Sequence, residues 1–160
     1  MSSRLVLTVK QAGFKKGISD DTLITHITYS LHGASTKLRA LTSDILAAIC
    51  YVSPTDGHKS VISAFSDYRI EFDERFRFQE LIDSLRVPDQ VDEDNESVNG
   101  VYGNEEEGVW EARTASMALV NAMTNFPDSL EDRILLREEL TRRGLNEAIV
   151  VRNNPYTPGY

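Results

Sequence analysis

Apolar residues recur at spacings of three and four along most of this chain, which is typical of helices with one buried face. The clearest stripe lies within residues 36–52, directly after Ser35, a residue type that caps helix N-termini. Its members are Leu38, Leu41, Ile45, Leu46, Ile49 and Val52. Pro54 and Gly57 then indicate a turn. No segment between turn signals alternates apolar and polar residues, so we predict no sheet.

The same spacing predicts further helices on both sides of this one. The first runs through Leu23, Ile24, Ile27 and Leu31, with Asp20 or Asp21 as its cap. The approximate bounds of the others are 57–68, 74–86, 109–124, 128–143 and 145–152. Gly33 and Gly144 are placed to end two of them. The helix pairs of this chain are compatible with the length of armadillo and HEAT repeats, about 40–47 residues. We therefore predict an all-α fold, an armadillo- or HEAT-like α-solenoid of about six or seven helices. A helix bundle is the alternative that the pattern leaves open.

The pattern also divides the chain. We expect residues 1–17 to be poorly structured, residues 18–152 to form the folded region, and residues 153–160 to fray. Within the folded region we predict a disordered acidic loop over residues 88–108. Its acids are Asp89, Asp92, Glu93, Asp94, Glu96, Glu105, Glu106 and Glu107.

The acidic loop also accounts for the net charge of the chain. The formal net charge is −8, from 25 acidic and 17 basic residues, and the acids of the loop account for all of it. An acidic segment repels phosphate groups and anionic lipids, so we expect no nucleic-acid partner and no membrane-surface partner. No apolar run is long enough for a membrane span.

Candidate catalytic and metal-binding residues are few. His26 and His32 are six residues apart and so do not share a helix face, and His58 follows a turn glycine. Solvated or capping roles suit all three. Cys50 lies among apolar neighbours, which predicts a buried and inert thiol and fits a reducing, cytoplasmic compartment. We expect no enzyme activity, no cofactor and no metal site.

Helix 36–52 carries a second notable face besides its apolar stripe. This face consists of Ala40, Ser43, Ala47, Ala48 and Tyr51. Small residues beside an aromatic ring can leave a shallow slot in which an amphipathic helix docks. They can equally allow a neighbouring helix of the same fold to pack closely, and the pattern alone does not choose between the two.

Several segments resemble the diaphanous-inhibitory, or FH3, armadillo region of formins, and most closely its fungal branch. They are Leu23–Gly33, Lys37–Leu41, Asp44–Cys50, Phe76–Phe78, Leu81–Leu85, Leu119–Met123 and Arg137–Leu145. The resemblance covers about residues 12–151 in order, including an acidic insertion between two halves.

The resemblance implies a regulatory role in actin assembly. In such formins this region binds an amphipathic autoregulatory helix from the C-terminus of the same polypeptide, which silences actin nucleation until a Rho-type GTPase releases it. The implied groove residues are Ile45, Ala48, Tyr51, Ala118 and Asn121. Actin would be an indirect partner, and the implied location is the cytoplasm, at the cytoskeleton.

The resemblance is to only part of a formin. The GTPase-binding segment and the first repeats would precede residue 12, so we expect the principal GTPase-binding surface to be missing here. Two rival interpretations follow. One is a truncated, marginally stable remnant that binds nothing, because a shortened solenoid exposes an apolar end. The other is an enzyme that uses a histidine with the acidic loop.

Overall fold

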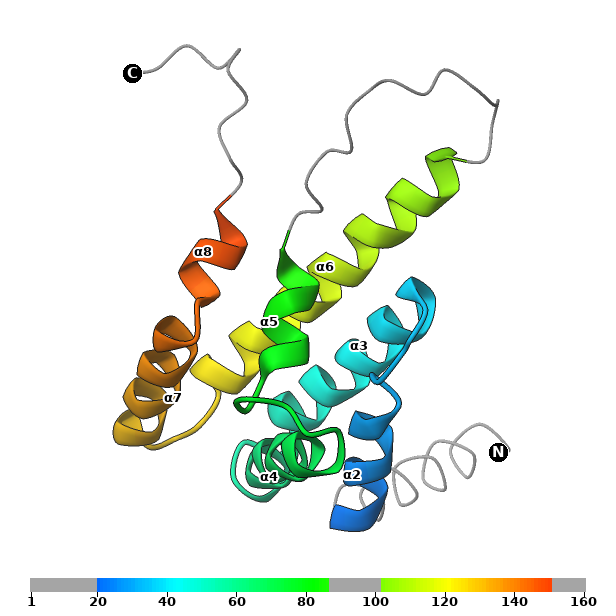
Figure 1. Ribbon diagram of the computed structural model, residues 1–160. Coiled ribbons are helices and arrows are strands. Elements are labelled where there is room, and N and C mark those ends of the chain that lie inside the picture. The colour runs from blue at the N-terminus through cyan, green and yellow to red at the C-terminus, as the bar shows by residue number, and fades with distance from the viewer. Residues whose placement is uncertain (1–19, 87–101, 151–160) are drawn as a thin grey trace, which may run out of the picture.

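The computed structural model describes residues 20–86 and 102–150, which form seven helices and, within those ranges, no strand (Figure 1). The helices are α2 (Asp21–Tyr29), α3 (Thr36–Val52), α4 (Asp56–Glu71), α5 (Gln79–Leu85), α6 (Tyr102–Asn125), α7 (Leu130–Arg142) and α8 (Leu145–Ile149). The prediction of an all-α fold is confirmed. The predicted segments 1–17 and 153–160, and the acidic loop up to residue 101, lie outside the described residues.

Side-chain caps begin three of the helices. The Asp20 carboxylate accepts hydrogen bonds from the backbone N–H groups of Thr22 and Leu23 at 3.0 and 3.3 Å. The hydroxyl groups of Ser35 and Ser129 each accept one bond, at 3.2 Å, from the N–H three residues later. Each cap satisfies a donor that the helix itself leaves unpaired, so these starts follow directly from the sequence.

Helix α6 begins at Tyr102, which corrects the predicted loop end at residue 108 and the predicted helix start at residue 109. The acids Glu105, Glu106 and Glu107 therefore lie in the first turns of a helix. Negative charge near a helix N-terminus interacts favourably with the exposed N–H groups there, so a run of acids is compatible with helix as well as with loop.

The connection between α4 and α5 also differs from the prediction. Helix α4 runs to Glu71, and Asp73 follows it in the left-handed conformation with φ 51°. The N–H of Glu74 donates to the carbonyl of Arg69 at 3.0 Å, a bond that closes the helix end. Phe78 has φ 70° and is buried, so α5 starts only at Gln79 rather than near residue 74.

Helices α3 and α6 lie side by side, with α2 and α4 on one side of the pair and α7 and α8 on the other (Figure 1). One apolar core runs through all seven helices. It includes Ile24, Leu46, Phe65, Leu81, Leu119, Leu140 and Ala148. A shared core of this kind is what holds stacked helical repeats together.

The stripe predicted for residues 36–52 is partly wrong. Leu46 and Ile49 are buried, but Leu38, Leu41 and Val52 are 41%, 58% and 53% exposed. The buried face instead includes Ala40, Thr42, Ser43 and Cys50. Because α3 is packed on two sides by other helices, small and polar residues occupy part of its interior face, and large apolar residues are left facing outward.

Candidate helix-binding groove

Small residues form the seam between α3 and α6. Ala40 of α3 and Ala112 and Ala115 of α6 make a buried cluster of their own. Near the starts of both helices, a Cβ placed on Gly108 would lie 3.0 Å from the Thr36 hydroxyl oxygen. Because these residues are small, the two helices can approach closely along the seam.

The two helices run in the same direction. Thr36 and Gly108 are close near the two N-termini, and at the other end the rings of Tyr51 and Phe126 meet edge to face with centroids 5.1 Å apart. Both helices rise by the same distance per residue. The two contacts differ in offset, 72 residues at the first end and 75 at the second, so Ile45 lies level with residues 117–120 of α6 and Ala48 with residues 120–123. Ala118 and Asn121 fall within those two stretches.

The structure thus brings the five predicted groove residues onto two neighbouring helices. Ala48, Ala118 and Asn121 are exposed, Tyr51 is 68% exposed, and Ile45 is half-buried against the core. On each helix they recur at intervals of three, which keeps them within one outward side. That they line a ligand groove stays a prediction.

The residues of the second face predicted for helix 36–52 do not all have the same role. The sequence left two roles open for them, close helix packing and an exposed slot. Ala40 and Ser43 are buried, and Ala47 is half-buried. Ala48 and Tyr51 are the members of that face that lie at the surface. Close helix packing therefore explains the first three, and an exposed slot remains possible only for the other two.

Sequence reasoning missed three large apolar residues near this surface. Leu41 is 58% exposed on α3, Trp110 is 54% exposed near the start of α6, and Phe126 is 37% exposed after its end. Arg113 lies over the Trp110 ring at 4.9 Å and donates to the carbonyl of Leu85 at 2.8 Å, which fixes that end of α6. Leu41 was assigned to the core because periodicity alone does not tell which stripe is buried.

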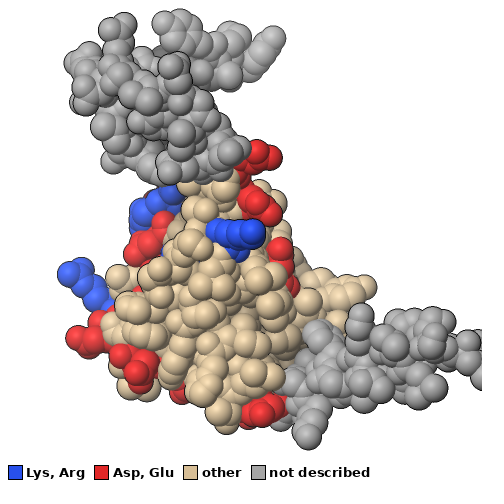
Figure 2. All heavy atoms as spheres, turned by 90° about the vertical axis from the view of Figure 1, so that its right-hand side faces the viewer, with Lys and Arg blue, Asp and Glu red and all other residues tan. Residues whose placement is uncertain are grey.

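Charged side chains are unevenly distributed over the described surface. Seen from the side that faces right in Figure 1, the described surface is largely uncharged in its middle, and most acidic and basic side chains lie toward its edges (Figure 2).

Two residues that could carry chemistry, Cys50 and His58, are buried. Burial raises the pKa of the Cys50 thiol to about 12, so the thiol stays protonated, in agreement with the prediction of a buried cysteine. His58 is also buried, and its Nε2 is 2.7 Å from the carbonyl oxygen of Met123. It therefore caps the C-terminal turn of α6. Among the described residues no cluster of His, Cys, Asp or Glu could hold a metal ion.

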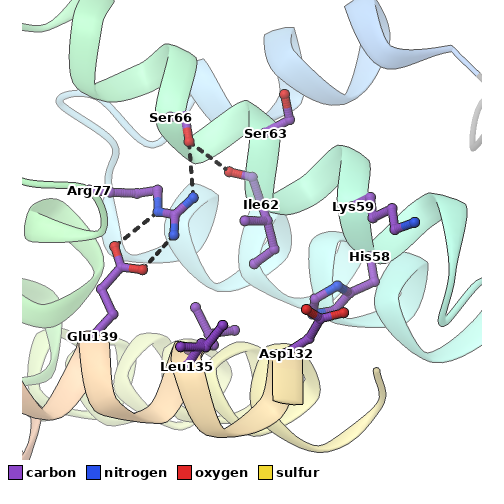
Figure 3. A pocket seen from close by; sticks show the side chains of 10 residues that line it. His58, Lys59, Ile62, Ser63, Ser66, Arg77, Asp132, Leu135 and Glu139 are labelled. Carbon is purple, nitrogen blue, oxygen red and sulfur yellow. Dashed lines mark hydrogen bonds and ion pairs between the residues drawn. The ribbon is translucent and has the colours of Figure 1, made fainter. Parts of the chain in front are cut away.

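A second hollow lies between α4 and α7, with a volume of about 520 Å³ (Figure 3). Ile62, Leu135 and Leu136 provide its apolar part. At one end Arg77 forms a two-bond ion pair with Glu139 and donates to the Ser66 hydroxyl at 3.2 Å, so it ties α4 to α7. None of the predicted groove residues lines this hollow.

The packed helices of the described residues define an all-α domain of the armadillo-like class. The sequence matches the Diaphanous FH3 Domain family over residues 58–152, and the chain belongs to that family. The recognised resemblance to the formin FH3 region is therefore confirmed.

Curated relatives are formins. Formin-F of Dictyostelium discoideum is 29% identical over 154 residues, or 95% of this chain. Formin-like protein 2 of Homo sapiens is 27% identical over 86% of the chain, and Disheveled-associated activator of morphogenesis 2 of Gallus gallus is 33% identical over 79%. The matches span only 11%, 11% and 10% of those relatives. No helix of the described part is long and apolar enough to cross a membrane.

Proposed function

We propose that this chain is a non-enzymatic regulatory module of a formin that binds an amphipathic autoregulatory helix on the surface shared by α3 and α6. Binding would keep actin nucleation by the rest of the formin switched off, and a Rho-type GTPase would relieve it. On this proposal the chain acts at the cytoskeleton and touches actin only indirectly.

The observation that carries the proposal is the combination of small and apolar residues on two parallel, adjacent helices. Ala48 and Ala118 project only a methyl group from their helices, so the backbone of a docked helix can approach closely. Leu41 and Tyr51, both more than half exposed, provide apolar contact along α3. Leucines spaced three and four apart on a partner helix would bury against such a surface.

Polar groups can fix the position of the docked helix. Asn121 is exposed beside Ala118 and offers a carboxamide that both donates and accepts hydrogen bonds. Ile45 is half-buried and supports the floor rather than a rim. In this assignment the small residues allow close approach, the apolar residues supply most of the affinity, and Asn121 selects the register.

A binding titration tests the proposal. A fluorescein-labelled peptide of a formin autoregulatory helix is titrated with the wild-type chain and with Ala48→Asp while fluorescence polarisation is recorded. We expect wild-type binding in the micromolar range or tighter. The variant should bind roughly a hundredfold more weakly, because an unpaired carboxylate buried against apolar side chains costs several kcal/mol.

Ser63→Asp is the matched control. Ser63 is exposed in the middle of α4 and lines the α4–α7 hollow, so the same carboxylate is introduced on a different surface. It should leave peptide affinity unchanged. Wild-type affinity retained by Ala48→Asp would remove the α3–α6 surface as the binding site. Absence of binding by a cooperatively folded wild type would mean that the groove of the family is present here only in outline and does not bind the helix.

A further inference from the structure

Helix α7 carries an exposed stripe that neither its packing nor the proposed groove explains. The stripe consists of Leu130, Ile134 and Arg137, which are spaced by four and three residues and so lie on one side of the helix. Leu130 is 62% exposed and Ile134 is 45% exposed. The core contacts of α7 come from Leu136 and Leu140, which lie on a different side.

A hydrogen bond places this stripe beside the end of the α3–α6 surface. A terminal nitrogen of Arg137 donates to the side-chain oxygen of Asn125. Asn125 is exposed and follows Ala118 and Asn121 at helical spacing, on the same side of α6. At the C-terminal end of α6, the surface that begins on α3 and crosses α6 therefore continues onto α7.

The charge of Arg137 is not neutralised within the described residues. Its bond to Asn125 is to a neutral amide, and no carboxylate among the described side chains, those of residues 20–86 and 107–150, lies within ion-pair distance of it. By contrast Arg77, Arg39 and Arg86 each pair with an acid. An oriented guanidinium beside two exposed apolar side chains is suited to bind a carboxylate that is next to an apolar residue.

Resting on the proposed function, we propose that α7 is the third wall of the helix-binding surface. The ligand continues past α6, where an apolar side chain covers Leu130 and Ile134 and an acidic side chain pairs with Arg137. This assigns to the ligand a property beyond amphipathicity: a carboxylate at the end that lies over the C-terminus of α6.

The test uses labelled peptides of the same autoregulatory helix that carry either three acidic or three neutral residues at one end or the other. With the wild-type chain, an acidic extension at the peptide end that lies over the C-terminus of α6 should tighten binding about threefold to fivefold at low salt, as expected for an exposed ion pair. Arg137→Glu should cancel that gain and leave the affinity for neutral extensions unchanged. Arg142→Glu, on the same helix but off the stripe, should preserve it.

A charge exchange sharpens the test. A peptide with a lysine extension at the same end should bind Arg137→Glu better than it binds the wild type. Ile134→Ser should weaken every peptide about threefold, because part of one aliphatic side chain is no longer covered. Circular dichroism melts of each variant establish that the fold is retained.

The possible failures are distinguishable. If Ala48→Asp abolishes binding but acidic and neutral extensions bind the wild type equally at both ends, the groove stands and the role of α7 is overturned. If Arg142→Glu cancels the gain as fully as Arg137→Glu, the effect is general electrostatics and the specific pairing is overturned. If no peptide binds the folded wild type, both proposals fall.

Discussion

Single residues in this domain show how burial changes the behaviour of an ionisable group. Burial raises the pKa of the Glu74 carboxyl, and the nearby Glu80 and Asp83 carboxylates act in the same direction, against a backbone hydrogen bond that lowers it. One of its oxygens is buried and finds no hydrogen-bond partner among the described residues. The ionised form of the Glu74 carboxyl is therefore less favourable in the folded protein than in the unfolded chain.

Replacing Glu74 with glutamine should stabilise the domain at neutral pH. Because the pKa is higher in the folded than in the unfolded state, the folded state binds the proton more tightly. Protonation thus favours folding as the pH falls through the Glu74 pKa, and the advantage of the variant should shrink over that interval. Urea unfolding of both proteins at neutral and at mildly acidic pH measures this. An advantage that is constant with pH would contradict the assigned cause.

The structural role of a residue was predictable from the sequence where a single property of that residue determines the role. Ser35, Gly144 and Cys50 behave as their types and positions indicate: a cap, a helix stop and a buried thiol. Leu41 was not predictable, because the sequence does not reveal that α3 is packed by α6 on one side and by α2 and α4 on the other. Only the tertiary arrangement decides which apolar stripe is left exposed.

At the scale of elements, the stability of the domain depends on contacts between helices that are far apart in the chain. His58, in the first turn of α4, is hydrogen-bonded to Met123, near the end of α6. Arg77 joins Ser66 of α4 to Glu139 of α7. Such bonds fix the position of α4 relative to two later helices.

His58→Ala should destabilise the domain by about 1–3 kcal/mol, because the buried Met123 carbonyl loses its partner. His58→Gln should lose less, since its amide nitrogen can reach the position of the imidazole Nε2. Chemical unfolding followed by circular dichroism gives the two free energies of unfolding. Equal losses for the two variants would mean that the ring contributes by packing and not by its hydrogen bond.

Some helix boundaries were predictable from the sequence and others were not. The starts of α3 and α7 follow from Ser35 and Ser129, whose hydroxyl groups make the caps. The start of α5 does not, because Phe78 adopts a left-handed backbone conformation to bury its ring, which is a tertiary effect. The early start of α6 was hidden by acids that suit both a loop and a helix N-terminus.

At the scale of the whole molecule, helical periodicity was sufficient to predict the fold class, and the family match agrees with the armadillo-like interpretation. The candidate groove could be predicted from the sequence only in part. Its small residues were visible in the sequence, but their division between the buried seam and the exposed face depends on how α3 and α6 pack. The proposed contribution of α7 could not be inferred from the sequence, because Arg137 and Asn125 lie on different helices.

The most direct test of the central claim locates the bound helix on the surface. Alanine-methyl NMR spectra of the labelled chain are recorded while the unlabelled autoregulatory-helix peptide is added. We predict the largest shift changes at the exposed methyl groups of Ala48 and Ala118, with little change at the buried Ala64 of α4. Saturable binding that leaves Ala48 and Ala118 unchanged would contradict the α3–α6 surface as the site of the partner helix.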